Sequence, residues 1–148
     1  MRLPSRSTKR AMFDARRLCW IRLALCWAVI LAGLSLRRWG MGAGLSFIVV
    51  KYGGSLLWGA MAYLLVALVM GARERRLVVA TALLVATAVE LFRLFHTPWL
   101  DAFRLTPAGA LMLGRVFSLW NIVAYAAGIL LGWRLDDMLD ERGRDHAI

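Results

Sequence analysis

Four long apolar stretches, separated by short charged segments, constrain the fold of this sequence more than any other feature. They cover residues 18–36, 47–70, 77–95 and 117–135. An α-helix rises 1.5 Å per residue, so about 20 residues cross the roughly 30 Å hydrocarbon core of a bilayer. Backbone amides in lipid must find their hydrogen bonds within the chain, which favours helices. The sequence therefore predicts an all-α integral membrane protein with a four-helix transmembrane bundle.

We predict that the two ends of the chain are tails of one single domain. Residues 1–17 are basic, residues 136–148 are charged, and residues 18–135 form the transmembrane domain. Basic residues before an apolar stretch also occur in cleaved signal peptides. Here, however, the stretch ends in "LAGLSLRRWG", with two arginines where a signal peptidase needs small neutral residues. We therefore expect the first helix to be retained.

The distribution of positive charge predicts the orientation. Thirteen of the nineteen lysines and arginines fall in or beside the two tails and the segment between the second and third stretches. By the positive-inside rule, both termini are then cytoplasmic, and six cations belong to the outer side. The net charge of +10 fits an orientation signal resting on anionic lipid better than a nucleic-acid site. The six outer cations are Arg37, Arg38, Lys51, Arg93, Arg104 and Arg115.

Between the third and fourth stretches, two Thr-Pro pairs predict short helices near residues 98–104 and 107–113. Both are too short to span a bilayer, so we expect them to lie in the outer interface. Trp99, Leu100 and Phe103 would then dip into lipid, with Asp101 and Arg104 on a wetter side.

Three polar residues on three different helices fall at one depth. Ser55, Glu90 and Asn121 each lie four or five residues inside the outer end of their helix, which is roughly 6–8 Å. A carboxylate there is costly unless it is paired, protonated or facing a wet cavity. We therefore predict an outward-facing polar cluster of Ser55, Glu90, Arg93 and Asn121, with Glu90 as the candidate catalytic residue. A basic and aromatic rim would surround it, formed by Lys51, Tyr52, Trp99, Asp101, Arg104, Arg115 and Tyr125.

Plainer interpretations of the same residues stay open. Glu90 and Arg93 are one turn apart, so they also fit a structural ion pair that fixes helix register. An interfacial anchor belt also fits Lys51, Tyr52, Trp58 and Trp99. The two histidines lie on opposite sides of the membrane, so we expect neither a metal site nor a cofactor.

Small residues line two of the predicted helices at the same positions as the polar groups. Gly59 lies on the second, and Ala124, Gly128 and Gly132 lie on the fourth. Such residues let helix backbones approach closely in lipid. They predict helix packing at this face, and Gly128 and Gly132 form a GxxxG motif that suits a homo-oligomer.

Three segments resemble one family. "KYGGSLLWGAMAY", "VELFRLFHTPWLDAFR" and "GRVFSLWNIVAYAAGILLG" are similar to the small bacterial membrane proteins grouped as domain of unknown function 2809, which are distantly VanZ-like. The similarity extends from the first helix to Gly132. It implies a multi-pass protein of the bacterial plasma (inner) membrane and supplies no reaction. The family pattern favours Gln at Arg93 and Asp at Ser55 and Asn121, so two carboxylates suited to acid–base chemistry are replaced here.

Three functional hypotheses follow, in order of preference. The first is a non-enzymatic envelope protein whose outer rim binds an anionic lipid head group or lipid-linked precursor, because arginine donors suit phosphate. The second is an intramembrane enzyme with Glu90 as general acid or base. The third is a subunit of an oligomeric channel or transporter assembled through the GxxxG face.

Overall fold

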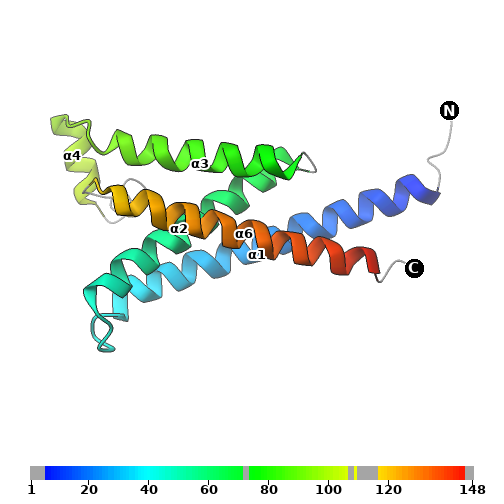
Figure 1. Cartoon of the computed structure of the whole chain (residues 1–148), viewed down its shortest axis with the longest axis horizontal. Coiled ribbons are helices and arrows are strands. Elements are labelled where there is room, and N and C mark those ends of the chain that lie inside the picture. The colour runs from blue at the N-terminus through cyan, green and yellow to red at the C-terminus, as the bar shows by residue number, and fades with distance from the viewer. Residues whose placement is uncertain (1–5, 72–73, 107–108, 110–116, 146–148) are drawn as a thin grey trace.

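The computed structural model describes residues 6–71, 74–106, 109 and 117–145, and these residues form helices and no strand. The all-α prediction is therefore confirmed for the described part of the chain. The helices are α1 (Arg6–Trp39), α2 (Phe47–Met70), α3 (Arg75–Phe92), α4 (Pro98–Leu105) and α6 (Leu119–Asp145) (Figure 1).

The four long helices run back and forth between the two ends of the molecule, and α2 crosses α6 at an angle (Figure 1). The two chain ends lie at one end of the bundle, called here the terminal end, while α4 and the α1–α2 turn lie at the other, the α4 end (Figure 1). Helix α2 is central, because it packs extensively against α6 and α1 and also contacts α3. Helices α1 and α6 touch at few positions. The interior is therefore organised around the α2–α6 pair.

Among the residues that the structure describes, two helices are long and apolar enough to cross a membrane. They are residues Arg16–Trp39 within α1 and all of α2. The four-span prediction is thus supported for only two helices on length and composition. Helix α3 has only 18 residues, and Arg75, Arg76 and Glu90 interrupt its apolar character.

Several boundaries differ from the predicted ones. Helix α1 begins at Arg6, so most of the predicted basic tail is helical, and α6 continues through the predicted charged tail to Asp145. Helix α3 ends at Phe92 rather than at residue 95. The first predicted short helix is confirmed as α4. The second, residues 107–113, lies outside the described residues except for Gly109.

Leu100 does not dip into lipid as predicted. Trp99 is 70% exposed and Phe103 is 40% exposed, whereas Leu100 and Arg104 are almost fully buried. Leu100 and Arg104 are one turn apart, so they share the face of α4 that is turned toward the rest of the bundle.

Helices α2 and α6 touch at backbone distance. A Cβ added to Gly59 would overlap the backbone of Tyr125, and one added to Gly128 would overlap the carbonyl oxygen of Leu56. Gly132 lies against the ring of Tyr63, while Ala124 is half-buried on the same helix. The predicted packing residues Gly59, Gly128 and Gly132 therefore lie at this contact. A homo-oligomer through Gly128 and Gly132 would have to displace α2.

Candidate functional site

Glu90 occupies the last turn of α3 and is completely buried. Val78, Ala82 and Ala86 precede it at intervals of four residues and are also buried. Residues spaced by four lie on one face of a helix, so the stripe that packs α3 into the bundle carries Glu90 inward with it. Burial of this carboxylate is a consequence of the apolar periodicity of α3.

Four donors surround the carboxylate of Glu90. Its Oε1 accepts hydrogen bonds from the backbone N–H of Ser118 at 2.8 Å and from Nδ2 of Asn121 at 3.1 Å. Its Oε2 accepts a hydrogen bond from the hydroxyl of Tyr125 at 2.9 Å and forms an ion pair with Arg93. An ionised carboxylate offers about four acceptor positions. Glu90 therefore has its hydrogen-bonding capacity filled by groups of the same chain.

Ser55 extends this network to α2. Its hydroxyl lies 3.2 Å from Oδ1 of Asn121 and 3.2 Å from the carbonyl oxygen of Lys51. The structure thus brings together all four residues of the predicted cluster, from α2, the end of α3 and α6. Whether they form a functional site stays a prediction. We call Ser55, Glu90, Arg93, Asn121 and Tyr125 the Glu90 cluster.

The predicted rim is only partly exposed. Tyr125 is 2% exposed and belongs to the Glu90 cluster. Lys51 is partly exposed on α2, with its ammonium 5.2 Å from the ring centre of Tyr52. Trp99 projects from α4, and Asp101 on the same helix contacts Arg104 and the ring of His96. Arg115 lies outside the described residues.

Arg104 is buried and holds the end of α3, so it is not available to an outer ligand. Its Nη1 donates to the carbonyl oxygen of Phe95 at 2.9 Å, and its Nη2 donates to that of Phe92 at 2.8 Å. The last carbonyls of a helix have no partner within it, and a cation there is favourable. Arg104 is therefore a C-terminal cap supplied by α4 to α3.

Replacing Arg104 by methionine should destabilise the protein by about 2–3 kcal/mol. Methionine keeps the length of the side chain but removes two hydrogen bonds that a charged donor makes to part-buried carbonyl oxygens, each worth roughly 1 kcal/mol or more. The free energy of unfolding in mixed micelles measures the change. Arg38→Met is the matched control because Arg38 is exposed. Equal stability of the two variants would contradict the cap.

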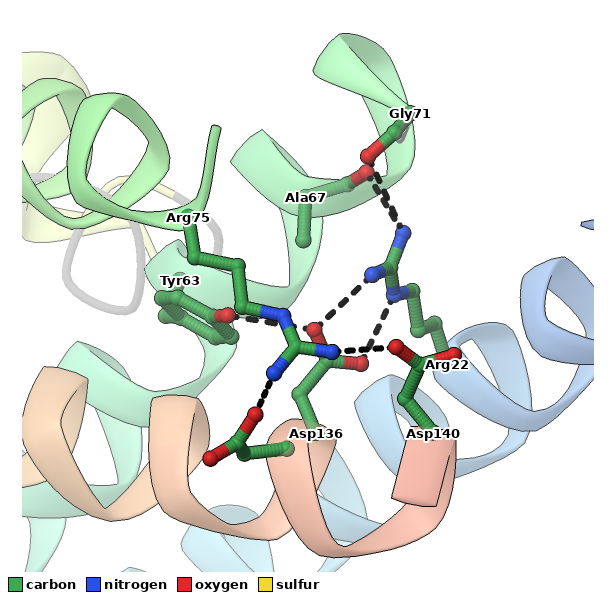
Figure 2. Close-up of polar contacts among 8 residues, drawn as sticks. Arg22, Tyr63, Ala67, Gly71, Arg75, Asp136 and Asp140 are labelled. Atoms are coloured by element: carbon green, nitrogen blue, oxygen red, sulfur yellow. Dashed lines mark hydrogen bonds and ion pairs between the residues drawn. The ribbon is translucent and has the colours of Figure 1, made fainter. Parts of the chain in front are cut away.

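A second buried polar cluster lies toward the terminal end, and the sequence analysis missed it (Figure 2). Arg22 of α1 binds Asp136 of α6 through two hydrogen bonds of 2.8 Å, and the hydroxyl of Tyr63 donates to the same carboxylate at 3.1 Å. Arg22 is 8% exposed and Asp136 is 1% exposed. We call these three residues the Asp136 cluster.

Arg75 adds a more exposed layer beside it. This residue of α3 forms ion pairs with Asp137 and Asp140, and all three side chains are roughly one-third exposed. The spacing of α6 could have revealed the buried member of this region. Asp136 follows Gly132 by four residues and therefore continues the stripe that packs against α2. The dipeptide Asp136-Asp137 instead suggested a solvated tail.

Three of the buried charges, Glu90, Arg104 and Arg22, contact the ends of neighbouring helices. Glu90 accepts from the amide that precedes α6, so an anion lies at a helix N-terminus. Arg104 and Arg22 donate to carbonyl oxygens at the C-terminal ends of α3 and α2, where cations are favourable; Arg22 reaches Ala67 at 3.1 Å. Glu90, Arg104 and Arg22 thus each cap a neighbouring helix. No group of three or more His, Cys, Asp or Glu side chains in the described chain is placed to hold a metal ion.

A family model matches residues 45–129, which is more than half of the 148-residue chain. The chain belongs to the family described as Protein of unknown function (DUF2809). No curated protein and no solved structure matches it. The DUF2809 match includes every member of the Glu90 cluster, whereas Arg22 and Asp136 lie on either side of the matched residues. The distant similarity to VanZ-like proteins stays a prediction.

Proposed function

We propose that this protein is a four-span, non-enzymatic membrane protein whose α4 end faces outward and binds an anionic lipid head group or lipid-linked precursor. Helices α3 and α6 are proposed as the third and fourth spans. Their exposed faces are apolar, as Leu84, Val123 and Leu130 illustrate, while Glu90 and Asp136 point inward. Ionisable residues of membrane helices face the bundle interior in this way.

The proposed orientation rests on charge. Among the described residues, exposed or half-buried arginines gather toward the terminal end, and fewer cations are exposed at the α4 end. The positive-inside rule then gives cytoplasmic termini. The family resemblance suggests the plasma (inner) membrane of a bacterium. The arginines of the terminal end are Arg16, Arg17, Arg75, Arg76 and Arg134.

The non-enzymatic proposal rests on the carboxylate of Glu90, because groups of the same chain already occupy its hydrogen-bond acceptor positions. A general acid or base must reach a proton of the substrate. Glu90 is fully buried, and the amide of Ser118, Asn121, Tyr125 and Arg93 already occupy its two oxygens. This geometry favours a scaffold that joins α2, α3 and α6 at their outer ends and supports the surface around them.

That surface keeps cations suited to phosphate. Glu90 and Asp101 are already bound by Arg93 and Arg104, so they do not neutralise the exposed Arg38 or the partly exposed Lys51. Exposed Trp39 and Phe47 stand beside these cations at the α1–α2 turn. Cations among exposed aromatic rings match the chemistry of an anionic head group at a membrane interface.

The Arg38→Gln/Lys51→Gln protein should bind anionic lipid about 30-fold more weakly at this end. Each basic residue near an anionic surface is worth roughly 1 kcal/mol, and 1.4 kcal/mol is tenfold in affinity. Labelling by a photoactivatable anionic phospholipid in nanodiscs, mapped by mass spectrometry to residues 37–52, measures the change. Arg76→Gln/Arg134→Gln is the matched control at the other end. Unchanged labelling in the first variant would refute the proposed site.

A further inference from the structure

A shallow hollow of about 690 Å³ lies on the surface of α1 toward the terminal end. Its size falls within the roughly 300–1,000 Å³ typical of small-molecule sites. Its lining is almost wholly apolar, so Arg16 and Arg17 contribute mainly their aliphatic stems and lie at its edge. It is lined by Arg16, Arg17, Trp20, Ile21 and Ala24.

The hollow faces away from the helix bundle. Successive residues of an α-helix are turned by about 100°, so Trp20 points roughly 160° away from Arg22. Arg22 binds Asp136, and Cys26, one turn further along, belongs to the buried core. Arg16, Arg17 and Trp20 are exposed by contrast, with Trp20 at 70%. In a membrane this face of α1 contacts lipid.

The acidic side chains of α6 that the structure describes pair with other arginines. Asp136 pairs with Arg22, while Asp137 and Asp140 pair with Arg75. Within the described part of the chain, no ion pair involves Arg16 or Arg17. Two guanidinium groups therefore stand beside an apolar surface of α1.

We infer that this hollow binds one anionic phospholipid of the leaflet at the terminal end, with its phosphate on Arg16 and Arg17 and an acyl chain over Trp20, Ile21 and Ala24. Guanidinium groups bind phosphate oxygens through paired hydrogen bonds. Trp20 suits the boundary between head group and chain, because tryptophan favours that depth. The apolar floor distinguishes this ligand from free phosphate. The site is separate from the one proposed at the α4 end.

The experiment uses the full chain in nanodiscs with a photoactivatable anionic phospholipid, and mass spectrometry locates the label. We expect labelling of residues 16–24 that unlabelled anionic lipid competes away and zwitterionic lipid does not. Arg16→Gln/Arg17→Gln should reduce this labelling about 30-fold, at roughly 1 kcal/mol per charge. Arg37→Gln/Arg38→Gln is the matched control, since it removes the arginine pair at the other end of the same helix and should leave labelling of residues 16–24 unchanged.

A folding control separates loss of the site from loss of the fold. Cys26 is 3% exposed, so it should stay unreactive to maleimide in both double variants. Three outcomes would overturn the proposal: full labelling without Arg16 and Arg17, equal competition by zwitterionic lipid, or cross-linking of this face to a second copy of the chain. If labelling is lost at residues 37–52 but kept at residues 16–24, the site proposed here stands and the one proposed at the α4 end fails.

Discussion

A Gly128→Ala protein should be less stable than the parent by about 3 kcal/mol. The added methyl group would overlap the carbonyl oxygen of Leu56 and lie 2.9 Å from the backbone nitrogen of Ala60. Overpacking a close-packed contact costs typically 1–3 kcal/mol, and the cost is highest where the obstacle is backbone that cannot rotate away. The expected effect is therefore at the top of this range.

The same glycine-to-alanine substitution at another position of the α2–α6 pair supplies the control. Gly54 lies in α2 with nothing within 4 Å of the position of an added Cβ. Alanine is favoured over glycine in a helix by about 1 kcal/mol, so Gly54→Ala should leave stability unchanged or raise it. One chemical change thus has opposite signs at two positions. Reversible unfolding in mixed micelles measures both, and equal stability would mean that α2 and α6 do not meet as described.

The Gly128 contact also sets the geometry of the Glu90 cluster. Ser55 and Asn121 stand on α2 and α6, and their 3.2 Å contact requires the close approach that the glycines permit. Gly59 has the same role from the other side, since a Cβ there would overlap the backbone of Tyr125. Small residues and polar groups share a face because the polar side chains are short and reach each other only between closely packed backbones.

Most residues of the Glu90 cluster could be predicted from sequence, because the depth of a residue in a membrane follows from its position along the helix. Ser55, Glu90 and Asn121 lie at similar distances from the outer ends of their apolar stretches, and counting residues places them at one level. The cost of an isolated carboxylate then favours contact among them. The partner Tyr125 was placed on the rim instead, because counting gives depth but not the direction in which a side chain points.

The contacts of Arg104 and of the Asp136 cluster could not be predicted from sequence for a related reason. Arg104 acts on carbonyls of α3, and the reach of a side chain from one helix to the end of another depends on how the chain turns at α4. Arg22 was interpreted as an orientation charge, and Asp136 as part of a tail. Their pairing joins positions 114 residues apart, and neither residue shows its partner in its local sequence.

An Asp136→Asn protein should lose about 3–5 kcal/mol of stability, the usual cost of breaking a buried ion pair by removing one partner. Arg22 would keep its charge while its bidentate carboxylate partner became a neutral amide, and Tyr63 would lose a charged acceptor. Because α1 touches α6 at few positions, we expect α1 to separate more readily from its neighbours.

The chain carries its own reporter for that separation. Cys26 of α1 is buried in the core with Tyr63, whereas Cys19 is exposed. In a Cys19→Ser background, maleimide labelling of Cys26 in membranes should be slow and should accelerate strongly with Asp136→Asn.

The matched control is Asp140→Asn, since its partly exposed pair with Arg75 is worth only about 0–1 kcal/mol. A combined Arg22→Met/Asp136→Leu protein should recover most of the lost stability, because replacing both members of a buried pair by apolar residues removes the uncompensated charge. The recovery should stay incomplete, since Arg22 also donates to the carbonyl oxygen of Ala67 at the end of α2. Slow labelling of Cys26 in Asp136→Asn would show that α1 is held by its contacts with α2 alone.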